Sequence, residues 1–201
     1  ADPALWKQAQ AHYHRSEKGG GEWEFLTRLP ERWTIQHQDL RFYVRPTGFK
    51  HTGLFPEQAA NWVWMGDLIR DSGRKDIRVL NLFGYTGGAT LACMAAGAHV
   101  THVDAAKGMI QWGKENRELS KLPEERSRWI VDTSAKVLSD KPLFFLINSY
   151  TTGFQASVLS NMLMKCVSSC HGGIIDAQEL CLPVTTGGVL PCGASGRWSA
   201  K

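Results

Sequence analysis

The sequence predicts an α/β fold in which helices cover both faces of a mostly parallel sheet. Between about residues 78 and 148, apolar segments of strand length alternate with segments of helical periodicity, the pattern of parallel strands joined by helical crossovers. One apolar strand also runs directly into a glycine-rich turn that opens a helix, at residues 79–88. With 201 residues, 43% of them hydrophobic, the chain can bury one substantial core.

An N-terminal arm and β-hairpin, residues 1–45, are expected before the main domain. Residues 1–21 end in three consecutive glycines and are interpreted as an arm or linker. Two aromatic and β-branched stretches follow, 32–35 and 40–44, with a polar tetrapeptide between them, which predicts a small hairpin. The main domain then spans residues 46–201.

The main domain is expected to alternate helices and strands to its end. The predicted order is a helix over 57–72, a strand over 78–83, a helix over 89–96, a strand over 99–104, a helix over 107–119, strands over 129–132 and 143–148, and a helix over 157–167. Two last apolar segments, 173–182 and 189–192, are expected to close the sheet as an antiparallel pair.

The glycine turn is the strongest local signal for a ligand site. Glycines let the backbone turn tightly and approach a ligand without an intervening Cβ, and the helix that follows offers free N–H groups. The spacing of Gly84, Gly87 and Gly88 departs from the three-glycine fingerprint of dinucleotide sites. A nicotinamide-dependent oxidoreductase therefore fits the sheet but lacks its signature.

Acidic residues end the next two strands. Asp104 lies about twenty residues beyond the turn, the separation at which a carboxylate accepts hydrogen bonds from ribose hydroxyls. Asp132 ends the following strand and is a candidate acceptor for an adenine amino group. Neighbouring parallel strands end at one edge, so the turn and these carboxylates are expected to face one crevice. The alternative is that Asp104 only caps the helix that follows it, and that Asp132 caps a segment or lies in a solvated loop.

These features resemble class I S-adenosylmethionine-dependent methyltransferases, and among them the group related to bacterial 23S ribosomal RNA cytosine and guanine methyltransferases. The resemblance covers roughly residues 42–198. It is carried by Thr52-Gly53-Leu54-Phe55-Pro56-Glu57-Gln58, by residues 81–88 and by Asp104. It implies a Rossmann-like domain that uses S-adenosyl-L-methionine.

The resemblance also implies roles for individual residues. Phe55 and Gln58 would contact the methionine end of the cofactor. The turn residues Phe83, Gly84, Tyr85 and Gly87 would hold its amino-acid moiety, while Asp104 would bind the ribose and Asp132 the adenine end.

One departure from the family concerns the acceptor site. The family carries a fourth strand and an Asp-Pro-Pro-Tyr or Asp-Pro-Pro-Ser motif, but this sequence has no Asp-Pro-Pro or Asn-Pro-Pro, and the segment expected between about 132 and 142 is missing. Either a stretch is disordered in or removed from this chain, or a natural variant shifts the strand at Leu143 into the gap. The intact flanking motifs favour the first interpretation.

Candidate catalytic groups are few. Cys192 is a candidate nucleophile, because methylation of cytosine at C5 begins with the addition of a thiolate to C6 of the ring. The alternative is that Cys192 is simply a small residue in a terminal strand. Asn148 and Tyr150 follow a strand at the expected cofactor edge and are candidates for substrate contact. The five cysteines lack the spacing of a zinc site, so no metal is expected.

The predicted function is methyl transfer from S-adenosylmethionine to RNA, with ribosomal RNA as the leading acceptor; the alternative is a module that binds the cofactor but is catalytically silent. A net charge of +4 is compatible with a polyanionic partner without requiring one. The basic stretch formed by Lys7, His12, His14, Arg15 and Lys18 is interpreted mainly as a solvated helix face. We expect a cytoplasmic protein that neither spans a membrane nor carries a signal peptide, and the oligomeric state is open.

Overall fold

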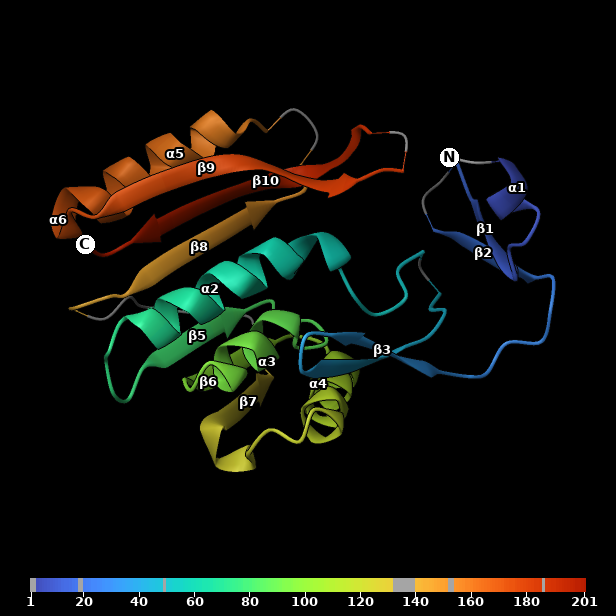
Figure 1. The fold of residues 1–201 in the computed structure, drawn as a ribbon, viewed down its shortest axis with the longest axis horizontal. Coiled ribbons are helices and arrows are strands. Elements are labelled where there is room, and N and C mark those ends of the chain that lie inside the picture. Colours follow the sequence, from blue (N-terminus) through green and yellow to red (C-terminus); the bar gives the residue numbers. More distant parts are fainter. Residues whose placement is uncertain (1–2, 18–19, 49, 132–139, 152–153, 186) are drawn as a thin grey trace. The chain divides into compact units, whose positions relative to one another are not determined.

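The computed structural model describes residues 3–17, 20–48, 50–131, 140–151, 154–185 and 187–201. The chain divides into two compact units (Figure 1), one formed by Asp2–Ala135 and the other by Lys136–Lys201 together with Ala1. Each unit has its own sheets, so the two are described in turn.

The first unit opens with a hairpin where an arm or linker was predicted. After a short helix α1 (Pro3–Trp6), strands β1 (Ala11–Arg15) and β2 (Gly21–Phe25) pair antiparallel. The linker prediction for this stretch, and the helix assumed for its basic residues, are wrong. At Gly21 a Cβ would lie 2.1 Å from the carbonyl oxygen of His14, so a glycine belongs to the hairpin itself.

The second hairpin is confirmed. Strands β3 (Trp33–His37) and β4 (Leu40–Val44) pair antiparallel across a turn in which Gln38 has a positive φ of 51°. Alternate residues of β4 are buried, because this strand packs against helix α4 (Lys107–Leu119).

The predicted alternation of strands and helices is confirmed in the rest of this unit. A 3-10 turn (Pro56–Gln58) leads into α2 (Ala59–Asp71), and the parallel strands β5 (Arg78–Leu82), β6 (His99–Asp104) and β7 (Ser127–Val131) lie in the order β5-β6-β7. Helix α3 (Gly88–Ala95) connects the first two strands, while α4 and a 3-10 turn (Glu124–Arg126) connect the last two. Helices α3 and α4 pack against the sheet (Figure 1).

The second unit is an antiparallel sheet covered by a helix. Strand β8 (Phe144–Ser149), helix α5 (Ala156–Leu163), a π-helical turn (Met164–Ser168), α6 (Ser169–His171), and strands β9 (Ile174–Pro183) and β10 (Val189–Ser199) follow one another. The sheet order is β8-β10-β9, and α5 lies along β9 and β10 (Figure 1). The predicted antiparallel pairing of the last two segments is confirmed.

Strand β10 extends well beyond the predicted 189–192. The glycines of this segment suggest from the sequence that the strand ends early. In the structure they instead allow close packing against the strand. A Cβ at Gly196 would lie 2.9 Å from the Cβ of Leu159, so the glycine lets α5 approach the strand closely. Gly193 follows a β-bulge in the pairing with β9.

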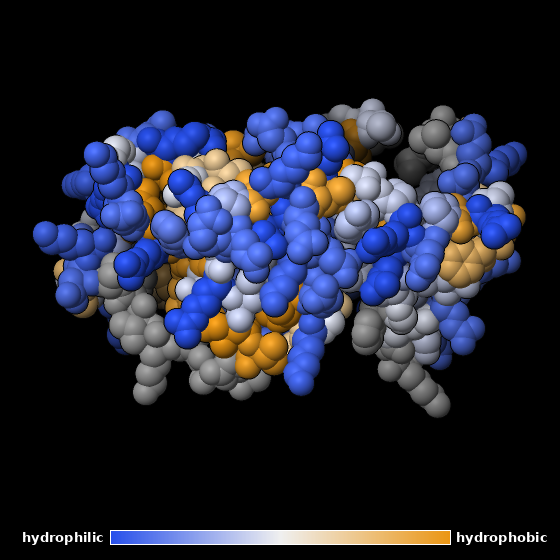
Figure 2. All heavy atoms as spheres, turned by 90° about the horizontal axis from the view of Figure 1, so that it is seen from below, coloured by the Kyte–Doolittle hydropathy of each residue, from blue (hydrophilic) through white to orange (hydrophobic). Residues whose placement is uncertain are grey.

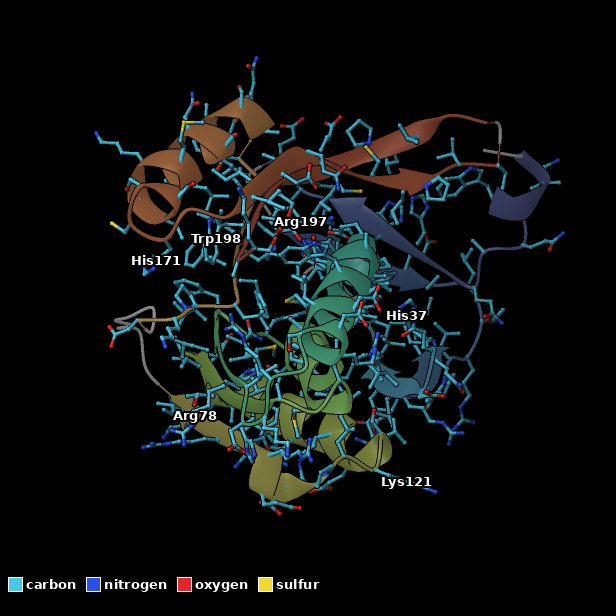
Figure 3. The ribbon with its side chains drawn as sticks, turned by 60° about the vertical axis from the view of Figure 1, so that its left-hand side comes forward. His37, Arg78, Lys121, His171, Arg197 and Trp198 are labelled. Carbon is cyan, nitrogen blue, oxygen red and sulfur yellow. The ribbon has the colours of Figure 1, made fainter. Side chains whose placement is uncertain are left out.

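Trp198 anchors the core of the second unit. It is 1% exposed and lies in a cluster with Leu163 and Val167. Its indole Nε1 donates to the carbonyl oxygen of Gly172 at 2.6 Å, and the ring of His171 lies beside it (Figure 3), with the ring centroids 6.1 Å apart. The C-terminal strand is thereby fixed to the end of the helix.

The outer strands of the two three-stranded sheets pair on one side only. Within the described ranges, β5 pairs with β6 alone and β8 pairs with β10 alone. Leu80 and Leu82 of β5 remain 42% and 38% exposed. The segment expected between about 132 and 142 falls largely on residues outside the described ranges, so its omission stays a prediction.

Polar side chains predominate on the face seen in Figure 2, where hydrophobic patches lie between projecting hydrophilic residues. Charged residues make up 21% of the chain. Among the described helices, none combines the length and the apolar composition needed to cross a bilayer.

Candidate cofactor site

The turn after β5 holds an unusual backbone. Phe83 and Tyr85 both adopt left-handed conformations, with φ of 55° and 52°, and Gly87 follows with φ of 92°. A bulky residue at positive φ is strained by about 1–3 kcal/mol, and such strain persists where a ligand site requires a particular backbone path. Phe83 is also 82% exposed, so packing within the described structure does not account for its conformation.

The glycines of the turn are required by close packing beneath it. A Cβ at Gly84 would lie 2.3 Å from Cε1 of His102, and one at Gly88 would lie 2.4 Å from Cζ2 of Trp62. The Gly84 N–H donates to the carbonyl oxygen of Val103 at 3.0 Å, which ties the turn to the neighbouring strand. The turn therefore lies directly on buried side chains, and Gly84, Gly87 and Gly88 are themselves buried while Phe83 is exposed.

Asp104 reaches the turn from the end of β6. Its Oδ2 accepts a hydrogen bond from the Tyr85 backbone N–H at 2.8 Å, and its Oδ1 accepts one from the Ala106 N–H at 2.9 Å, at the start of α4. The carboxylate thus fixes both the glycine turn and the residue before α4, whose N-cap is Ala106 and which has no side-chain capping hydrogen bond. Each carboxylate oxygen can accept a further bond, so the group retains capacity for a ligand.

The segment upstream of α2 lies beside the same turn. The Thr86 hydroxyl donates to the carbonyl oxygen of Gly53 at 2.6 Å, and both residues are buried. The ring of Phe55 lies 5.2 Å from that of Tyr85, measured between centroids. The Gln58 side-chain oxygen accepts from Asn61 at 2.8 Å, which orients the first turn of the helix. The structure therefore brings Phe55 to the glycine turn and places Gln58 on the helical turn that follows Phe55.

Asn116 holds the glycine turn through hydrogen bonds, and the sequence does not predict this role. It is fully buried in α4; its amide nitrogen donates to the carbonyl oxygen of Thr86 at 2.9 Å, while its oxygen accepts from the Tyr43 N–H at 2.8 Å. A polar residue on the buried face of a predicted helix is the only sequence signal for it, and that signal names no partner.

His102 is the second residue that sequence reasoning misses. It is fully buried behind the turn, where its Nδ1 shares a 2.9 Å hydrogen bond with the Thr90 hydroxyl, which accepts from the Asn81 amide at 2.8 Å. Its Nε2 has no hydrogen-bond partner among the described residues. Burial lowers the pKa of His102 to about 4, while the nearby Asp104 carboxylate and the Tyr85 backbone raise it to a smaller extent. The imidazole is therefore neutral at pH 7.

The free energy of unfolding should fall on acidification because of His102. In the unfolded chain this residue titrates near its ordinary pKa of 6.5, so between pH 6.5 and about 4 the unfolded state binds a proton that the folded state does not. The expected loss reaches about 3 kcal/mol at the lower end. Urea unfolding of the wild type and of His102→Gln at several pH values would measure it. Parallel pH profiles for the two proteins would contradict this assignment.

Phe83→Gly should separate binding from folding. Glycine adopts positive φ without strain, and the largely exposed ring contributes little burial, so the midpoint of thermal unfolding is expected to stay within a few degrees of the wild type. If the ring contacts the cofactor, the dissociation constant for S-adenosylmethionine rises about tenfold. Differential scanning fluorimetry and calorimetric titration test the two halves. A clear fall in stability with unchanged affinity would assign Phe83 to the fold.

The catalytic candidates form a separate group in the second unit. Asn148 pairs with Ser195 in the register of β8 and β10, and Tyr150 follows β8 with half of its side chain exposed. A Cβ at Gly193 would lie 3.1 Å from Cδ1 of Tyr150, which places the bulge at Cys192 next to that ring. These three residues are near one another, whereas Asp132 lies outside the described residues.

An open cavity lies at the opposite end of the parallel strands from the glycine turn. It has a volume of about 460 Å³ and is lined by the ends of α2 and α3 and the residues that begin the strands, among them the basic Arg70, Arg74, Lys75, Arg126 and His99. Ligands in open α/β sheets bind at the carboxyl ends of strands, so the cavity is not the cofactor site.

The chain is similar to proteins that are described as methyltransferases. It is 36% identical over 159 residues to ribosomal RNA large subunit methyltransferase K/L of Psychrobacter, an alignment that covers 70% of this chain and 19% of the relative. The same-named protein of Magnetococcus marinus is 29% identical over 143 residues, which cover 65% and 19%. This chain thus spans about a fifth of the length of these relatives.

A solved structure and a family model agree with this likeness. The crystal structure of an S-adenosylmethionine-dependent methyltransferase from Agrobacterium tumefaciens matches 98% of this chain and 79% of its own, with 29% identity and a TM-score of 0.89. The model of the S-adenosylmethionine-dependent methyltransferase family matches residues 6–136, a stretch that includes the strained turn and Asp104. This protein belongs to the S-adenosylmethionine-dependent methyltransferase family.

Proposed function

We propose that this chain positions S-adenosylmethionine for methyl transfer to RNA, with ribosomal RNA as the acceptor. The observation that carries the proposal is the strained glycine turn held by the Asp104 carboxylate, within the stretch matched by the family model. The acceptor class rests on the relatives, which are named for ribosomal RNA.

The residues around the turn fit such a cofactor. The turn residues Phe83, Gly84, Tyr85 and Gly87 would surround its amino-acid moiety, a role supported by their unusual backbone conformations and by the exposed ring of Phe83. Asp104 would accept from the ribose hydroxyls with its remaining lone pairs. Phe55, beside Tyr85, and Gln58 would flank the methionine end. Asp132 is proposed for the adenine end from its position after β7.

The protein's contribution would be alignment. The sulfonium of S-adenosylmethionine already activates the methyl group, so the chain has to orient donor and acceptor and exclude water. Asn148, Tyr150 and Cys192 are the residues proposed to contact the acceptor.

One basic surface of the first unit suits a polyanion. Arg70, Arg74, Lys75 and Arg126 line the 460 Å³ cavity with one acid, Asp76, although Arg70 also forms an ion pair with Asp67. Cationic side chains of this kind contact phosphates without reading the base sequence. RNA bound at the active site would place further phosphates along such a surface. Because these contacts are electrostatic, the affinity for RNA would fall as the salt concentration rises.

A transfer assay tests the proposal. Protein is incubated with S-adenosylmethionine that carries a radiolabelled methyl group and with deproteinised ribosomal RNA, and the label in RNA is counted. We expect incorporation by the wild type and none by Asp104→Ala. Binding of the cofactor without transfer to any RNA would favour the catalytically silent alternative, which the lack of an Asp-Pro-Pro motif in the sequence supports.

A further inference from the structure

The two faces of the β1–β2 hairpin differ in chemistry. Side chains alternate between the faces of a strand, and in the register of this hairpin Tyr13 is opposite Trp23. Their rings lie 5.3 Å apart between centroids, and the Trp23 indole donates to the carbonyl oxygen of Thr47 at 2.9 Å. The aromatic face is thus anchored, and the other face carries His12, His14, Glu22 and Glu24.

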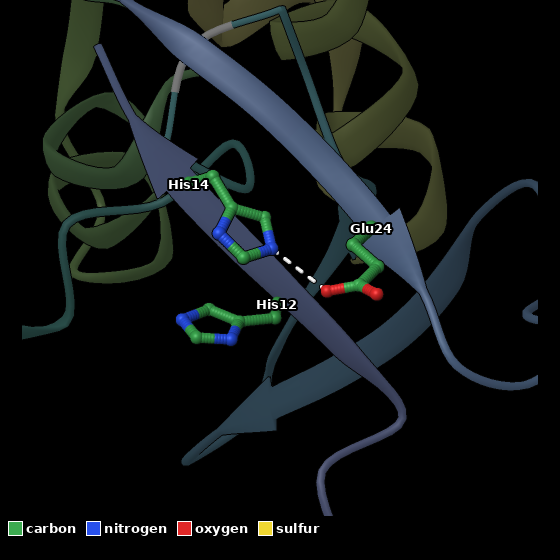
Figure 4. A group of neighbouring side chains, drawn as sticks. All are labelled: His12, His14 and Glu24. Carbon is green, nitrogen blue, oxygen red and sulfur yellow. Dashed lines mark hydrogen bonds and ion pairs between the residues drawn. The ribbon is translucent and has the colours of Figure 1, made fainter.

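Three of these side chains, His12, His14 and Glu24, lie close together on this face (Figure 4). His14 Nε2 lies 2.7 Å from Glu24 Oε2, and the rings of His12 and His14 stack with centroids 4.4 Å apart. One nitrogen of each histidine and one oxygen of Glu24 all lie within 4.8 Å of one another. In the part of the chain that the structure describes, no other set of three histidine, cysteine or acidic side chains converges in this way.

We propose that His12, His14 and Glu24 form a binding site for a divalent late-transition metal ion of the zinc class. Two imidazoles and a carboxylate suit Zn²⁺, Ni²⁺ or Cu²⁺, whereas Mg²⁺ and Ca²⁺ take oxygen ligands. The side chains of His14 and Glu24 are 57% and 55% exposed, so water completes the coordination.

Side-chain rotation would bring the three ligand atoms, now within 4.8 Å of one another, to the spacing that an ion requires. Nitrogen and oxygen ligands about 2.0–2.2 Å from a tetrahedral Zn²⁺ lie about 3.4 Å from each other. The 2.7 Å contact between His14 and Glu24 would therefore open by less than an ångström through side-chain rotation. His12 comes from the same strand face and Glu24 from the partner strand, so the ion would cross-link β1 to β2.

Calorimetric titration of ZnCl₂ into tag-free, chelator-treated full chain tests the site. We expect the wild type to bind Zn²⁺ at one strong site. The dissociation constant should rise at least about tenfold in His12→Ala, His14→Ala and Glu24→Gln, because each variant loses one ligand. Glu22→Gln is the matched control, because it removes the same charge from the same strand but lies outside the converging group. Circular dichroism confirms that each variant is folded.

A spectroscopic readout makes the result independent of catalysis. With Cu²⁺ as the probe, electron paramagnetic resonance should show hyperfine coupling to two imidazole nitrogens in the wild type, which the double variant His12→Ala/His14→Ala loses. Equal Zn²⁺ affinity in the wild type and this double variant, or no binding by the wild type, would overturn the proposal. The proposed methyl transfer is unaffected by either outcome, since the hairpin site and the glycine turn share no residue.

Discussion

Asp104→Asn is expected to raise the dissociation constant for S-adenosylmethionine by about 10- to 100-fold. The substitution keeps the shape of the side chain but removes its charge and one acceptor, and a hydrogen bond to a charged group contributes about 1.5–3 kcal/mol. The amide cannot accept from both the Tyr85 and Ala106 N–H groups while also binding ribose, so the turn is held to β6 more weakly, although the bond from Gly84 to Val103 remains. The free energy of unfolding should therefore fall by about 1–3 kcal/mol.

The two effects are measured separately. Calorimetric titration gives the dissociation constant, and urea unfolding gives stability. Asp67→Asn is the control, because Asp67 forms an exposed ion pair with Arg70 on α2, away from the turn, and such pairs contribute little. If Asp104→Asn lowered stability but bound the cofactor as tightly as the wild type, Asp104 would serve only to hold the turn in place.

Gly84→Ala is expected to damage both the turn and the fold. The new methyl group would lie 2.3–2.7 Å from three atoms of the His102 ring, which is fully buried and hydrogen-bonded to Thr90. Overpacking of this kind costs about 1–3 kcal/mol, and relieving it would displace the turn from the position that Asp104 fixes. We therefore expect lower stability together with loss of measurable cofactor binding.

Gly108→Ala provides the matched control. Gly108 lies in the first turn of α4, and a Cβ there would meet no atom within 4 Å. Alanine favours helix over glycine by about 1 kcal/mol, so this variant should be as stable as the wild type or more so. Equal behaviour of the two variants in urea unfolding would contradict the packing described for Gly84.

The sequence predicts the parallel part of the fold well because local patterns determine it. The predicted bounds of β6 and α4 coincide with those observed, since an apolar run with an acidic end and a periodic helix each carry their own signal. The convergence of the glycine turn and Asp104 also follows from the sequence, because neighbouring parallel strands must end at one edge.

The features that were missed depend on contacts between distant residues. The glycines near residue 20 were interpreted as a linker because glycine breaks structure, but Gly21 is required by the close approach of the His14 carbonyl across the hairpin. The bond between Thr90 and His102 and the two bonds of Asn116 join separate elements, and no local pattern reveals them. Strand β10 was predicted too short because its glycines serve a packed helix.

Calorimetric titration of S-adenosylmethionine into the wild-type chain, beside Asp104→Asn and Asp67→Asn, tests the central claim most directly. We predict one site per chain, binding by the wild type and by Asp67→Asn, and an affinity reduced about 10- to 100-fold in Asp104→Asn. No heat of binding with the wild type, or equal affinity in all three proteins, would contradict the assignment of the glycine turn and Asp104 as the cofactor site.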